Sequence, residues 1–123
     1  MMKRKVLVID DDQLTLAIVR DTLEEGGFAV VTLSAPRLVA NVILRERPDL
    51  VLVDVRMPEL SGDLLVEFVS QFKQLGQVPM VLFSAEEEDA LARLAERSGA
   101  RGYIKKTEDQ ALLLRQVRSF LPI

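Results

Sequence analysis

Short apolar runs alternate along this chain with longer segments whose apolar residues recur at helical spacing. The runs are predicted as five β-strands, at Val6–Ile9, Ala29–Leu33, Leu50–Val53, Met80–Phe83 and Gly102–Ile104. The first, third and fourth are apolar at nearly every position, which is typical of parallel strands covered by helices on both faces. Parallel neighbours need crossover connections, so helices are expected between the strands.

Five helices are predicted. The first spans Gln13–Glu25 and ends at Gly26–Gly27. Its expected apolar face is made by Leu14, Ala17, Ile18 and Leu23. The others are expected from about Ser34–Pro36 to before Pro48, from Ser61 to Leu75 with Gly76 closing the helix, over Glu86–Ser98 before Gly99, and over Glu108–Leu121.

This alternation predicts an α/β fold, a doubly wound (βα)₅ sandwich around a parallel five-stranded sheet. The 123 residues, 49% of them apolar, fit one domain over residues 1–123 with a substantial core. In such open sheets ligands bind at the carboxyl ends of the strands.

Composition narrows the chemistry. The absence of cysteine and histidine excludes disulfides, thiol and imidazole catalysis and the usual zinc sites. The net charge is −3 and basic residues are scattered, which argues against direct nucleic-acid binding. No signal-peptide core or membrane span is apparent, so a soluble, cytoplasmic protein without membrane contact is expected.

Aspartates gather where two predicted strands end. Asp10, Asp11 and Asp12 follow the first run, and Asp54 follows the third. Each close pair of carboxylates costs on the order of 4 kcal/mol at a surface-like dielectric, unless a cation or a proton intervenes. A divalent metal is therefore predicted.

The other strand ends add further polar groups. Ser84 follows the fourth run and Lys106 the fifth, whereas the second run offers only Ser34. If the first, third and fourth strands are adjacent, these groups converge on one pocket.

The motifs VLVIDDD, LVLVDVRMP, VLFSA and GYIKK resemble, in order and spacing, the receiver domain of two-component response regulators. The resemblance covers essentially the whole chain. It implies a flavodoxin-like fold with strand order 2-1-3-4-5, and it assigns roles to individual residues. These are Asp54 as phosphoacceptor, Asp10 and Asp11 with Asp54 as magnesium ligands, the main-chain carbonyl of Arg56 as a further ligand, Ser84 as the switch hydroxyl, Tyr103 as the switch aromatic, and Lys106 as the conserved-type lysine.

The resemblance also implies a function. A phosphoryl group would pass to Asp54 from a sensor histidine kinase or phosphotransfer protein, in a reaction that needs Mg²⁺ or, as a substitute, Mn²⁺. The surface of segments 86–98, 102–104 and 108–121 would then change towards a downstream target, an output domain or a second copy. The chain would be a regulatory phosphoacceptor with at most slow self-dephosphorylation, and not an enzyme.

Several of these residues also have purely structural interpretations. Asp12 is expected to be the N-cap of the first helix. Ser84–Glu87 and Thr107–Gln110 both fit the capping-box pattern. Lys105 and Lys106 are both candidates for the site lysine. Strand alternation favours Lys106 weakly, and the spacing after Tyr103 that the family shows selects it.

Two positions near the predicted pocket carry further expectations. Thr107 stands where the family usually has proline, so a trans bond is expected before it. Arg56 and Glu86 are placed to pair across the pocket mouth, where they would tune the lifetime of the phosphorylated state.

The sequence is also compatible in part with other functions. A degenerate receiver that acts as an interaction module without phosphorylation stays open, as does the question whether the chain is a stand-alone regulator or a fragment. A haloacid-dehalogenase-like phosphatase would use Asp10 and Asp12, but it leaves Asp54 unexplained. Flavin binding is disfavoured because the first loop is anionic.

Overall fold

The computed structural model describes residues 3–75 and 77–121, which form a five-stranded parallel sheet. The strands are β1 (Lys5–Ile9), β2 (Ala29–Leu33), β3 (Leu50–Asp54), β4 (Met80–Ser84) and β5 (Gly102–Lys105). Their order in the sheet is β2-β1-β3-β4-β5, and every neighbouring pair is parallel. The predicted fold class, strand positions and strand order are confirmed.

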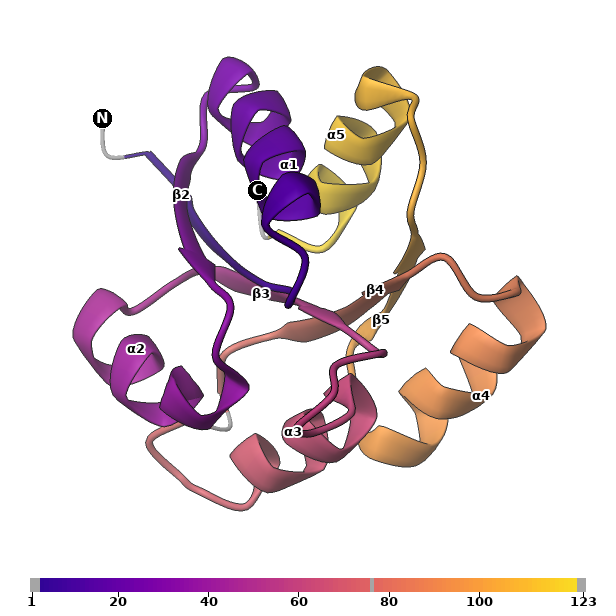
Figure 1. Ribbon diagram of the computed structural model, residues 1–123. Helices are drawn as coiled ribbons and strands as arrows, with labels where there is room; N and C mark the ends of the chain where they lie inside the picture. The colour runs from indigo at the N-terminus through magenta and orange to yellow at the C-terminus, as the bar shows by residue number, and fades with distance from the viewer. Residues whose placement is uncertain (1–2, 76, 122–123) are drawn as a thin grey trace.

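Helices cover both faces of the sheet. They are α1 (Gln13–Glu25), α2 (Val39–Glu46) with the short 3₁₀ turn η1 (Pro36–Leu38) before it, α3 (Gly62–Ser70), α4 (Glu88–Ser98) and α5 (Gln110–Ser119). Figure 1 shows α1 and α5 together on one face, and α2, α3 and α4 on the other. No helix in the described part of the chain is long and apolar enough to cross a membrane.

The core forms because strand side chains alternate between the two faces. Val6 and Val8 of β1 pack with α1 and α5, whereas Leu7 and Ile9 pack with the helices of the opposite face. Every residue of β3 and β4 is buried, as is all of β1 except Lys5. The nearly continuous apolar runs are therefore explained by burial on both sides.

The buried face of α1 differs from the predicted one. Leu14 is 67% exposed and Ile18 is 54% exposed, while Leu16 and Val19 pack in the core beside Leu23. Both sets of apolar residues have helical spacing, so periodicity does not distinguish them. The docking of α1 on the sheet decides which set is buried.

The α3 prediction was too long. The helix ends at Ser70, and residues 71–75 continue as turns in which Phe72 N–H donates to Val69 O and Leu75 N–H to Phe72 O. These bonds span three residues and tighten the chain beyond α-helical geometry. The predicted stop at Gly76 lies outside the described residues.

Helices α4 and α5 begin two residues later than predicted, and neither uses the predicted capping box. Glu87 precedes α4 without a side-chain cap, because Ser84 is the last residue of β4. Asp109 caps α5 by accepting from Leu112 N–H, and Thr107 Oγ1 accepts from Asp109 N–H. The N-cap predicted at Asp12 is confirmed by its bond from Leu14 N–H at 3.1 Å.

Candidate functional site

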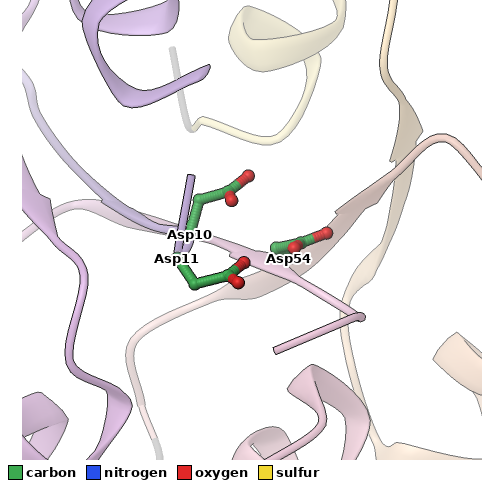
Figure 2. Close-up of side chains that lie close together, drawn as sticks. All are labelled: Asp10, Asp11 and Asp54. Carbon is green, nitrogen blue, oxygen red and sulfur yellow. The ribbon is translucent and has the colours of Figure 1, made fainter. Parts of the chain in front are cut away.

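The predicted aspartate cluster forms at the carboxyl edge of the sheet. Strands β1 and β3 are neighbours in which Ile9 pairs with Val53, so Asp10 and Asp54 leave the sheet side by side. Carboxylate oxygens of Asp10, Asp11 and Asp54 all lie within 4.8 Å of one another. Figure 2 shows Asp10 and Asp11 extending toward the side on which Asp54 lies.

The three carboxylates differ in their freedom. Asp10 is 1% exposed, and both of its oxygens are engaged, by Asp12 N–H at 2.9 Å and by Lys106 Nζ at 2.8 Å. Asp11 is exposed, and within residues 3–75 and 77–121 its carboxylate has no hydrogen-bond or ion-pair partner. Asp10 is therefore fixed, whereas Asp11 has oxygens free to bind a cation.

Lys106 supplies the positive charge of the cluster. Its ammonium group lies 2.8 Å from Asp10 Oδ2 and 3.4 Å from Asp54 Oδ1, and 5.4 Å from the centroid of the Phe83 ring. Lys105, the alternative considered from the sequence, is exposed. Among the described residues, this ammonium group contacts two of the three clustered carboxylates, so the cluster keeps a net negative charge that a bound cation could balance.

Burial and charge shift the pKa values of this pair. Burial raises the pKa of Asp54 above 3.8, and the Asp10 charge adds to this effect, while Lys106 opposes it. Burial alone would lower the pKa of Lys106, but the hydrogen bond and charge of Asp10, with the charge of Asp54, raise it above 10.5. Lys106 is therefore charged at neutral pH. Burial and the Asp10 charge make the ionised form of Asp54 less stable than that of an exposed aspartate.

An open cavity of about 330 Å³ adjoins Asp54. It is lined by Asp54, Arg56, Ser84, Ala85, Glu86 and Lys106. Ser84 is buried at the end of β4, where its Oγ accepts from Glu86 N–H at 3.2 Å. Arg56 Nε donates to Glu86 Oε1, so the pairing predicted across the mouth of this cavity is confirmed.

The backbone around the site has two further features. None of the described peptide bonds is cis, so the bond before Thr107 is trans as predicted. Lys106 N–H donates to Ser84 O at 2.8 Å, which ties the ends of β4 and β5 together. Tyr103 lies on β5 and is partly buried against the core on the α4 side of the sheet.

Gly62 has a packing role that was not predicted from the sequence. A Cβ atom on Gly62 would lie 2.2 Å from the backbone oxygen of Asp54, and Gly62 N–H donates to Val55 O at 2.9 Å. Only glycine permits this approach. A glycine a few residues after a strand that ends in aspartate was the available signal.

Comparisons with known proteins agree with this geometry. Residues 6–118 match the family model described as the response regulator receiver domain. The polar-differentiation response regulator DivK of Brucella ovis is 22% identical over 120 residues, covering 98% of each chain.

Solved structures give the same result. The chemotaxis protein CheY4 of Vibrio cholerae has a TM-score of 0.89 at 26% identity, covering 98% of this chain and 100% of that chain. The BeF3-activated N-terminal receiver domain of RstA from Klebsiella pneumoniae has a TM-score of 0.85 at 30% identity, with the same two coverages.

Proposed function

The chain belongs to the response regulator receiver domain family, and on that premise we propose that Asp54 accepts a phosphoryl group from a partner's phosphohistidine. Members of this family are regulatory phosphoacceptors rather than enzymes in the usual sense. The observation that carries the proposal is the position of Asp54. Its carboxylate stands between the acidic pair Asp10 and Asp11, the ammonium group of Lys106 and an open cavity.

In the proposed transfer, one Asp54 carboxylate oxygen forms a bond to phosphorus as the phosphorus–nitrogen bond of the donor breaks. The imidazole of the donor leaves with the electron pair and takes up a proton. The Lys106 ammonium group lies 3.4 Å from Asp54 Oδ1. From there its positive charge can stabilise the negative charge on the equatorial oxygens of a loose, in-line transition state. The chain contributes positioning and charge, and it needs no acid or base of its own.

The residues present fit a magnesium ion. Three carboxylates offer oxygen atoms within 4.8 Å of one another, and oxygen ligands are those that Mg²⁺ prefers. Asp11 and Asp54 would hold the ion directly and Asp10, whose oxygens are both engaged, would act through a water molecule, with the Arg56 carbonyl as a further ligand. When bound, the ion neutralises charge on the transferring phosphoryl group.

Ser84 and Tyr103 are proposed to report the modification. Ser84 Oγ borders the same cavity as Asp54, so its hydroxyl can donate to a phosphoryl oxygen after it reorients. That movement would draw the β4–α4 loop inward and open space for the Tyr103 ring. The surface of α4, β5 and α5 would change as a two-state element biased by a local charge.

The partners follow from this chemistry. The donor would be a sensor histidine kinase or a phosphotransfer protein. The recipient of the signal would be a downstream protein, an output domain, or a second copy bound through α4, β5 and α5. The proposed compartment is the cytoplasm, without direct nucleic-acid or membrane contact.

Intact-mass analysis tests the proposal. After incubation with acetyl phosphate, the mass should increase by one phosphoryl group with Mg²⁺ or Mn²⁺ and stay unchanged with a chelator. Asp54→Asn should abolish the adduct, whereas Asp49→Asn, an exposed aspartate before β3, should not. If no adduct forms, the chain is a receiver that acts without phosphorylation, and steady turnover of a phosphomonoester would instead indicate a phosphatase.

A further inference from the structure

The mouth of the cavity carries an ion pair that the proposed transfer does not use. Arg56 Nε donates to Glu86 Oε1, which joins the loop after β3 to the loop after β4. The Arg56 side chain is 79% exposed, whereas that of Glu86 is 20% exposed. The arginine is therefore the partner that is free to move, and Glu86 is the one held by its surroundings.

Arg56 is also close to the acceptor carboxylate. Its side chain lines the cavity that Asp54 lines, and its backbone N–H favours the charged form of Asp54. A guanidinium group can bind phosphoryl oxygens through two parallel hydrogen bonds. An ion pair with an exposed partner is weak by comparison, because water and salt screen it.

We propose that Arg56 is a further phosphoryl-binding residue, which Glu86 holds at the cavity mouth until Asp54 is modified. This inference rests on the proposed function of Asp54. A phosphoryl group on Asp54 carries about two negative charges, and it places them in the cavity. It competes with the Glu86 carboxylate for the guanidinium group, and Arg56 exchanges one anion for the other.

The exchange reaches the β4–α4 loop through Glu86. The Glu86 side chain is bound by Arg56, and its N–H donates to Ser84 Oγ at 3.2 Å. When Arg56 leaves Glu86 for the phosphoryl group, Glu86 is no longer bound to the loop after β3. Ser84 can then turn its hydroxyl toward the phosphoryl group. Arg56 thus acts as a binding residue and Glu86 as a positioning residue.

Beryllofluoride, which stands in for a phosphoryl group on a carboxylate, provides the test. Its Kd in the presence of Mg²⁺ is measured by calorimetry for the wild type, Arg56→Gln, Glu86→Gln and the double variant. Loss of a charge-assisted bidentate contact should raise the Kd of Arg56→Gln about tenfold. Glu86→Gln should lower it about threefold, since Arg56 is already released.

The double variant and a matched control separate this exchange from a general charge effect. In the Arg56→Gln background, Glu86→Gln should give no further tightening. Glu87→Gln removes the same charge one residue along, from an exposed side chain that forms no ion pair within the described part of the chain, and should leave the Kd unchanged. Circular dichroism without ligand checks that every variant is folded.

Each other outcome counts against the exchange. Additive effects in the double variant, or weaker binding by Glu86→Gln, would overturn it while the phosphoacceptor role of Asp54 stands. An Arg56→Gln variant that binds like the wild type would do the same. A wild type that does not bind beryllofluoride with Mg²⁺ would remove the proposed function, and the exchange with it.

Discussion

Lys106→Met should strongly destabilise the metal-free protein. The substitution keeps an unbranched side chain of similar length and removes the only ammonium group that contacts the buried carboxylates of Asp10 and Asp54 in the described structure. At an effective dielectric of 20, separations of 2.8 and 3.4 Å correspond to gross attractions of about 6 and 5 kcal/mol. Recovered hydration of the lysine offsets part of this, and the expected net loss is about 3–5 kcal/mol.

Urea unfolding in the presence of a chelator measures this loss. Lys105→Met is the matched control, because Lys105 is the exposed neighbour on the same strand end, and its free energy of unfolding should change by less than about 0.5 kcal/mol. Added Mg²⁺ should reduce the deficit of Lys106→Met, since the ion then supplies positive charge beside the carboxylates in place of the ammonium group. A deficit below about 1 kcal/mol in the chelator would show that the Lys106 ammonium group does not stabilise the buried carboxylates to this extent.

The pH dependence gives an independent check. Lys106 lowers the pKa of Asp54, so without it the folded-state pKa of Asp54 rises further above 3.8. The folded variant then binds more protons than the unfolded chain, and its stability increases as pH falls. The deficit should shrink as pH falls through the raised folded-state pKa of Asp54 toward 3.8. In the wild type the pKa of Lys106 is raised, so its stabilisation is present below pH 10.5 and is lost only as pH rises through the folded-state pKa.

Three further predictions address the metal site, the site backbone and the α1 face. Mg²⁺ at tenfold its Kd should stabilise the wild type by about 1.4 kcal/mol in thermal unfolding, and Asp11→Asn should lose this gain while Asp12→Asn keeps it. Gly62→Ala should cost about 1–3 kcal/mol in urea unfolding, because its methyl group would lie 2.2 Å from a backbone oxygen; an unchanged midpoint would contradict the close approach. Leu16→Ala should cost about 2–4 kcal/mol and Leu14→Ala less than about 0.5 kcal/mol, and the reverse order would restore the face predicted from the sequence.

The strands could be predicted because their signal is local. Runs such as Leu50–Val53 are apolar at every position, and a short run of this kind is typical of a parallel strand covered on both faces. The helix ends were less predictable. At Ser84 and Thr107 the residues fit a capping box, but the helices begin later, because each serine or threonine belongs to the preceding strand or turn.

The order of residues along the chain is enough to predict which polar groups stand at the strand ends. In a parallel sheet all carboxyl ends meet at one edge, so the pattern of strands was enough to bring Asp10, Asp54, Ser84 and Lys106 to that edge. The order of the strands came from the resemblance to a family. Neither the strand pattern nor the family resemblance gives the distances between these groups.

How these groups pair with one another depends on the three-dimensional packing of the chain. In the folded protein the Lys106 ammonium group lies closer to Asp10 than to Asp54. Asp11 has no partner among the described residues, and Arg56 pairs with Glu86. The same packing turns Leu16 rather than Leu14 into the core. These choices depend on how helices and loops dock on the sheet, and docking is set by contacts between residues far apart in the chain, which periodicity and spacing do not encode.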